Sequence, residues 1–163
     1  NIAISHVKKP VYYLDRGNYY AELGDLVNAE LDYSKAIELD STLTGSYNNR
    51  TFYIWFPKKE YQNAVDDLSK IIAIAPENAY AHSNRSYAYY GLKDFEHAFI
   101  DAFKSVEIEN RNPYVYKNLA LMYYAIGEKE EATNALKGAL NWSFPVDSDP
   151  EFKVLLIQLG FTE

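Results

Sequence analysis

The chain has 163 residues, of which 48% are hydrophobic, and this length suits one compact domain or one short solenoid. Its 16 Tyr, 8 Phe and 2 Trp supply ample apolar area, while 7 Gly and 6 Pro are too few for a disordered chain or a turn-rich β architecture. A net charge of −7 with scattered cations argues against nucleic acid as a partner, because neutralising phosphates requires clustered Lys and Arg. There is no cysteine for disulfides or thiolate sites, and no apolar run is long enough for membrane insertion.

An alanine recurs along the chain and marks four repeats. Ala29, Ala64, Ala98 and Ala132 are spaced by 35, 34 and 34 residues. This period is typical of stacked helix–turn–helix repeats, each of which buries an apolar face against its neighbours. The spacing predicts a lead segment at 1–9, followed by four repeats at 10–43, 44–78, 79–112 and 113–143.

A turn is predicted between the two helices of each repeat. The first helices are expected to end, and the second to begin, at Gly24-Asp25, Lys58-Lys59, Lys93-Asp94 and Gly127-Glu128. The second repeat is one residue longer than the others and carries Pro57 beside its turn. Because proline disfavours helical backbone in the residue before it, we expect the first helix of this repeat to end early.

The segments YYLDRGNYYAELGD and DYSKAIELD of the first repeat closely resemble the tetratricopeptide repeat (TPR) family, and the resemblance extends over residues 10–143. The proline usual between repeats survives only as Pro76. The resemblance implies an all-α, right-handed superhelical solenoid of helix–turn–helix repeats whose first helices line a concave face.

The stretch SFPVDSDPEFKVLLIQLGF, within a predicted capping segment at 144–163, looks like the closing segment of many bacterial TPR arrays. Asp149 is expected to cap a short helix that begins at Pro150. The apolar face of this helix is predicted to consist of Phe152, Leu155, Leu156 and Leu159. Since a last repeat without a cap would expose its apolar side, we expect the array to end here and residues 1–9 to continue a further segment.

No constellation typical of an enzyme, a metal site or a cofactor site is recognisable. His82 stands where the other repeats have tyrosine, so we expect a packed core residue, and we expect His97 at the surface. The run from Asp147 to Glu151 lacks the glycine and the length of a calcium loop, and helix capping explains it better. The sequence therefore predicts neither catalysis nor a cofactor.

The candidate site is a groove along the first helices. Positions 2, 5, 6, 9 and 12 of each repeat remain for the concave face once positions 4, 8 and 11 are buried between helices. Asparagine recurs at position 6, where its donor and acceptor suit the amides of an extended peptide, and aromatic neighbours would supply contact area. The predicted peptide-binding groove consists of Asn18, Asn49, Phe52, Trp55, Tyr80, Asn84, Tyr87, Tyr90, Tyr114, Lys117, Asn118 and Tyr124.

Two polar positions have structural interpretations as well. The asparagines at position 6 also fit solvated sites or hydrogen bonds to the next repeat. The arginines at position 7 are expected to pair with acidic residues at position 23, such as Asp32 or Asp67, within the array; these arginines are Arg16, Arg50 and Arg85.

The TPR resemblance implies that the partner is another protein. TPR domains that bind chaperone tails use a carboxylate clamp of two Asn, two Lys and one Arg. Asn18 and Asn49 match the asparagines, whereas the cation positions fall on Leu14, Tyr80 and Asn84. Without these cations an acidic tail has little to stabilise it, so we expect a neutral or basic segment, extended or helical.

A second hypothesis is self-assembly or intramolecular docking through the N-terminal edge. Residues 1–9 provide no convincing cap there, so the first repeat could stack on another subunit and form a homo-oligomer. Catalysis is the least favoured hypothesis, and turnover that depends on His82 or His97 would revive it.

Overall fold

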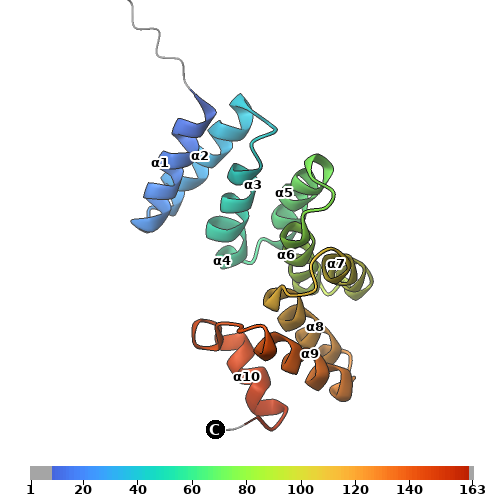
Figure 1. The fold of residues 1–163 in the computed structure, drawn as a ribbon. Helices are drawn as coiled ribbons and strands as arrows, with labels where there is room; N and C mark the ends of the chain where they lie inside the picture. Colours follow the sequence, from blue (N-terminus) through green and yellow to red (C-terminus); the bar gives the residue numbers. More distant parts are fainter. Residues whose placement is uncertain (1–8, 162–163) are drawn as a thin grey trace, which may run out of the picture. The chain divides into compact units, whose positions relative to one another are not determined.

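The computed structural model describes residues 9–161, and the chain divides into two compact units, unit 1 (Asn1–Pro76) and unit 2 (Glu77–Glu163). All regular elements of the described residues are helical, which confirms the predicted all-α repeat (Figure 1). Residues 1–8 of the predicted lead segment and residues 162–163 of the predicted capping segment lie outside the described part. None of the helices within residues 9–161 has the length and hydropathy needed to cross a bilayer.

Unit 1 consists of antiparallel helix pairs joined by short turns (Figure 1). Its elements are α1 (Pro10–Glu22), α2 (Leu26–Leu39), α3 (Thr44–Arg50), the π-helical turn η1 (Thr51–Trp55), α4 (Phe56–Lys58) and α5 (Tyr61–Ile74). α1 packs along α2, and α5 packs along α3 and η1. Tyr33 of α2 is completely buried and meets Gly17 of α1, where a Cβ atom would lie 2.8 Å from the tyrosine ring. Glycine at this position therefore lets the two helices approach closely.

Unit 2 repeats this arrangement and adds a closing helix. Its elements are α6 (Ala79–Gly91), α7 (Phe95–Ile108), α8 (Pro113–Ala125), α9 (Lys129–Asn141), the 3₁₀ turn η2 (Val146–Ser148) and α10 (Pro150–Gln158). α6 packs along α7, and α8 packs along α9. α10 begins as predicted: Asp149 accepts a hydrogen bond of 2.9 Å from the Phe152 amide, and Pro150 occupies the first helical turn.

The same turn ends the first helix of every pair; it lies at the predicted place in three pairs and one residue later, at Lys59-Glu60, in the second pair. In each turn a residue with positive φ is followed by an amide that donates five residues back along the helix. These bonds run from Asp25 to Tyr20, Glu60 to Trp55, Asp94 to Tyr89 and Glu128 to Tyr123, at 2.9–3.0 Å. The residues with positive φ are Gly24, Lys59, Lys93 and Gly127.

The prediction that the first helix of the second repeat ends early is wrong. The chain stays helical from Thr44 to Lys58, because η1 accommodates the additional residue in one wide turn, where the Phe56 amide donates to the Thr51 carbonyl. The residues from Trp55 onward are therefore shifted by one position relative to the other repeats. Counted back from the turn, Trp55 occupies the position of Tyr20.

The arginines at position 7 form the predicted ion pairs inside the helix pairs. Each guanidinium makes two hydrogen bonds of 2.6–2.8 Å to one carboxylate, in the pairs Arg16–Asp32, Arg50–Asp67 and Arg85–Asp101. These hydrogen bonds raise the pKa of Arg16 and of Arg85 still further above the physiological range. In the last repeat the buried residues Leu119 and Ala135 stand at the equivalent positions.

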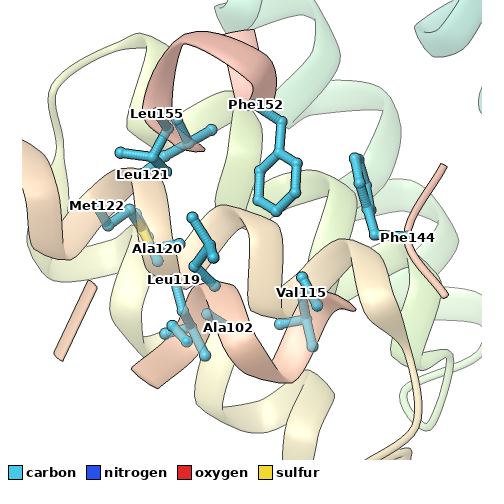
Figure 2. Close-up of a cluster of buried hydrophobic side chains, with 13 residues drawn as sticks. Ala102, Val115, Leu119, Ala120, Leu121, Met122, Phe144, Phe152 and Leu155 are labelled. Atoms are coloured by element: carbon cyan, nitrogen blue, oxygen red, sulfur yellow. The ribbon is translucent and has the colours of Figure 1, made fainter. Parts of the chain in front are cut away.

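α10 completes the hydrophobic core of unit 2. Phe152 is 0% exposed, and its ring centroid lies 4.6 Å from that of Phe144. Figure 2 shows these two rings side by side and places Leu155 of α10 against Leu121 of α8. Burying one phenylalanine and one leucine contributes about 3–6 kcal/mol, so α10 is an integral part of this unit.

Candidate functional site

In unit 1 the predicted site residues Asn18 and Asn49 meet between α1 and α3. The Asn49 amide nitrogen donates to the Asn18 carbonyl oxygen over 2.7 Å, and the Tyr33 hydroxyl donates to the same oxygen over 3.0 Å. Burial raises the pKa of Tyr33 further above neutrality. The NH₂ group of Asn18 has no hydrogen-bond partner among the described residues. It is therefore available to a ligand.

Exposed side chains surround this amide pair. Phe52 is 62% exposed and follows Asn49 by three residues, which places both on the same side of the helix. Asp15 lies three residues before Asn18 and Glu22 four residues after it, and both are exposed. Within residues 9–161 neither carboxylate forms an ion pair. We call Asp15, Asn18, Glu22, Asn49 and Phe52 the unit 1 face; it is polar, aromatic and acidic.

Trp55 does not belong to this face, which corrects the prediction. It is 8% exposed, and its indole nitrogen donates to an Asp67 carboxylate oxygen over 2.8 Å. The Arg50 guanidinium carbon lies 5.4 Å from the centroid of the indole ring. The shift of one position caused by η1 explains why this residue points into the interior of unit 1.

In unit 2 the two predicted asparagines differ from each other. Asn118 is buried and donates to the Ser83 carbonyl over 2.8 Å and to the Ser86 hydroxyl over 3.2 Å. It thus bonds to the neighbouring repeat, which was the structural alternative, and is not open to a peptide. Asn84 is half-buried, and its side chain forms no hydrogen bond to another described residue.

Lys117, also predicted to line the groove, is buried beneath the start of α10. Its ammonium nitrogen lies 3.1 Å from an Asp149 oxygen and 3.7 Å from a Glu151 oxygen. The same nitrogen lies 4.2 Å from the centroid of the Tyr87 ring. The prediction that Lys117 faces a peptide is therefore wrong, because the first turn of α10 covers it.

The predicted tyrosines of unit 2 border the covered region. The rings of Tyr87 and Tyr90 stack with centroids 6.1 Å apart, and their hydroxyls donate to the Glu151 carboxylate over 3.2 and 3.5 Å. Tyr114 is exposed and makes an edge contact with Phe144 at 5.4 Å, and Tyr80 is exposed as well. α10 therefore lies over much of the face that α6 and α8 were expected to present.

A cavity of about 360 Å³ remains beside α10. We call it the α10 pocket; its lining residues are Tyr90, Leu121, Tyr124, Ala125, Glu151, Val154, Leu155 and Gln158. Tyr90 and Tyr124 were predicted for the site, whereas the α10 residues were missed. The available signal was Lys117, the one cation at position 5 of any repeat, together with the acidic residues Asp149 and Glu151 shortly before Phe152.

The histidines have structural surroundings. His82 is buried, as predicted, and its Nδ1 lies 3.1 Å from an Asp101 oxygen. His97 is exposed, as predicted, and its Nδ1 lies 2.8 Å from an oxygen of Asp94, the N-cap residue of α7. Hydrogen bonding from His97 lowers the pKa of Asp94.

Comparisons with known proteins identify the fold. Residues 11–43 match the model of the tetratricopeptide repeat. No curated protein sequence matches the chain. TTC0263, a thermophilic TPR protein of Thermus thermophilus, is 17% identical, with a TM-score of 0.78 over 93% of this chain and 83% of its own.

Two further solved structures have the same fold. MamA from Desulfovibrio magneticus RS-1 is 19% identical, with a TM-score of 0.75 over 89% of this chain and 80% of its own. The first TPR of Spaghetti (RPAP3), solved with the HSP90 peptide SRMEEVD, is 24% identical. Its TM-score is 0.68 over 73% of this chain and 94% of its own. The chain is thus a tetratricopeptide-repeat protein in fold, and residues 11–43 carry the sequence pattern of that family.

Proposed function

We propose that this protein is a binding module for another protein, and that the unit 1 face holds a neutral or basic segment of the partner. The observation that carries the proposal is the Asn18–Asn49 amide pair, which is fixed by its internal hydrogen bonds and keeps the Asn18 NH₂ group available. An amide held in this way can bond to a peptide backbone without losing side-chain entropy on binding. The fold supports the proposal, because a TPR neighbour is solved with a bound peptide.

The charge of the unit 1 face selects the chemistry of the partner. The HSP90 peptide of the Spaghetti complex carries three acidic side chains. Asp15 and Glu22 would repel such a peptide, whereas they would attract a segment that contains Lys or Arg. The exposed ring of Phe52 would contact an apolar residue of the same segment.

Peptides selected on the wild-type protein from a random display library test this site. We expect the selected peptides to be neutral or basic, and Phe52→Ala to weaken their binding about tenfold, because exposed aromatic residues dominate small interfaces. Asn49→Ala is expected to weaken binding as well, since it releases the Asn18 carbonyl from its 2.7 Å hydrogen bond. Isothermal titration calorimetry with one synthetic peptide measures both effects.

Phe103→Ala is the matched control, because it removes an exposed phenylalanine from α7 of unit 2. It is expected to leave the affinity unchanged. Acidic selected peptides, or equal losses for Phe52→Ala and Phe103→Ala, would contradict the proposal.

Stacking through the N-terminal edge is a second candidate function. Tyr12 and Tyr19 on α1 are each 59% exposed, whereas the residues at the same positions of α8, Val115 and Met122, are completely buried in unit 2. Ser46, which corresponds to Tyr12 in the second repeat, is buried in unit 1. These positions normally lie between repeats, so their exposure on α1 favours an interface with a further helix pair.

If the further helix pair belongs to a second copy, the mass of the protein in sedimentation equilibrium should rise from micromolar to millimolar concentration. The double variant Tyr12→Ser/Tyr19→Ser should remain monomeric over this range, while Phe103→Ser should associate like the wild type. A constant monomer mass for the wild type at all concentrations would exclude self-association through this edge.

A further inference from the structure

We propose that the α10 pocket binds one lysine or arginine side chain of the partner protein. The inference rests on the proposed function, since it assumes a basic partner, but it concerns a different surface in a different unit. The pocket is open, has a volume of about 360 Å³ and combines apolar walls, two tyrosine rings and a carboxylate.

The lining suits a side chain with an apolar stem and a cationic end. Leu121 and Leu155 are buried and form an apolar wall, to which Val154 adds exposed apolar surface. Lysine and arginine bury their methylene groups against such surfaces and keep their charge at the opening. The rings of Tyr90 and Tyr124 would attract that charge through their negative faces.

The charges around the pocket favour a cation over an anion. Glu151 is the only charged residue among the described residues that line the cavity. Beside the pocket, the carboxylates of Asp149 and Glu151 share one ammonium group, that of Lys117. The three charges sum to one net negative charge. The hydroxyls of Tyr87 and Tyr90 donate to Glu151 and fix its position. An acidic side chain would therefore be repelled.

The chain already binds one of its own lysines in this way. The Lys117 ammonium lies 3.1 Å from Asp149, 3.7 Å from Glu151 and 4.2 Å from the centroid of the Tyr87 ring. Glu151 thus contacts Lys117 and Tyr87 on one side. It also accepts a hydrogen bond from Tyr90, which lines the cavity together with it. The α10 pocket offers a second cation the same combination of carboxylate and aromatic ring.

The test is an NMR titration of the ¹⁵N-labelled chain with four blocked pentapeptides, in which glycines flank a central arginine, lysine, norleucine or glutamate. The arginine and lysine peptides should shift the amides of Tyr124, Leu155 and Gln158, with a Kd of about millimolar. The norleucine peptide, which has the stem without the charge, should bind about three- to tenfold more weakly, and the glutamate peptide should cause no shift.

Glu151→Gln should weaken the binding of the arginine peptide about three- to tenfold. Glu130→Gln is the control, because it makes the same change in the first turn of α9. Tyr124→Leu keeps the apolar wall and should also weaken binding, which provides a second variant if Glu151→Gln unfolds. Equal binding of the norleucine and arginine peptides, or no shift at the pocket amides, would overturn the inference.

The two proposals can fail separately. If the peptides shift only the amides of the unit 1 face, at Asn18 and Phe52, the inference that the α10 pocket binds a cation is overturned. The proposed function then still stands. Shifts at the pocket, together with selected peptides whose binding Phe52→Ala does not change, would support the pocket and contradict the unit 1 site.

Discussion

Replacing Phe152 by alanine is expected to lower the free energy of unfolding of unit 2 by about 3–5 kcal/mol, the cost of emptying a fully buried aromatic site. The ring is 0% exposed and lies in the core cluster beside Phe144, where Figure 2 shows it between α10 and the neighbouring helices. The remaining cavity cannot collapse easily, because the helices of unit 2 hold each other in place. Urea denaturation followed by circular dichroism measures the loss, and hydrogen exchange assigns it to unit 2.

Val154→Ala is the control on the same helix. Val154 is exposed, so its truncation should change the free energy of unfolding by less than about 0.5 kcal/mol. A loss of under about 1 kcal/mol for Phe152→Ala would mean that α10 does not complete the core. It would also remove the basis of the α10 pocket, one wall of which is α10.

Asp67→Ala is expected to destabilise unit 1 by about 3–5 kcal/mol, because it leaves a buried cation and a buried donor without their partner. The Asp67 carboxylate accepts two hydrogen bonds from Arg50, at 2.6 and 2.8 Å, and one from the Trp55 indole at 2.8 Å. Arg50 is itself mostly buried, so water can replace the carboxylate only in part. This loss of stability measures the cost of leaving Arg50 and Trp55 without Asp67, and it does not equal the net contribution of the intact Arg50–Asp67 ion pair.

Tryptophan fluorescence in a Trp142→Phe background measures this effect, since Trp55 then reports on unit 1 alone. Asp66→Ala is the matched control: Asp66 is the preceding residue, is exposed and accepts one hydrogen bond of 3.0 Å from Gln62. Asp66→Ala should lower the free energy of unfolding by about 0.5 kcal/mol or less. Equal effects of the two substitutions would show that the Arg50–Asp67–Trp55 network does not stabilise the fold.

Both predictions bear on the proposed binding surfaces. Trp55 and Asp67 support the helix that carries Asn49 and Phe52, so the network holds the unit 1 face in place. Phe152 holds α10 over α8 and thereby positions Glu151 at the α10 pocket. Each site therefore depends on a buried contact behind it, and the binding experiments require variants whose folding has been verified.

The sequence by itself determined the features that depend on local chemistry or on one repeat period. The turns follow from residues that tolerate positive φ, such as Gly24, and the start of α10 follows from Asp149 and Pro150. The Arg–Asp pairs were predictable because arginine at position 7 recurs together with aspartate at position 23 in three of the repeats. For the same reason the burial of His82 followed from its position in the repeat.

Only the tertiary structure decided which predicted site residues are accessible. One additional residue can interrupt a helix or widen a turn, and the packing around η1 selected the wide turn that buries Trp55. Asn118 and Lys117 occupy periodic positions like their counterparts, but the serines of α6 and the acidic turn of α10 bury them. Such contacts join residues far apart in the chain, and a repeat alignment compares equivalent positions without showing what lies against them.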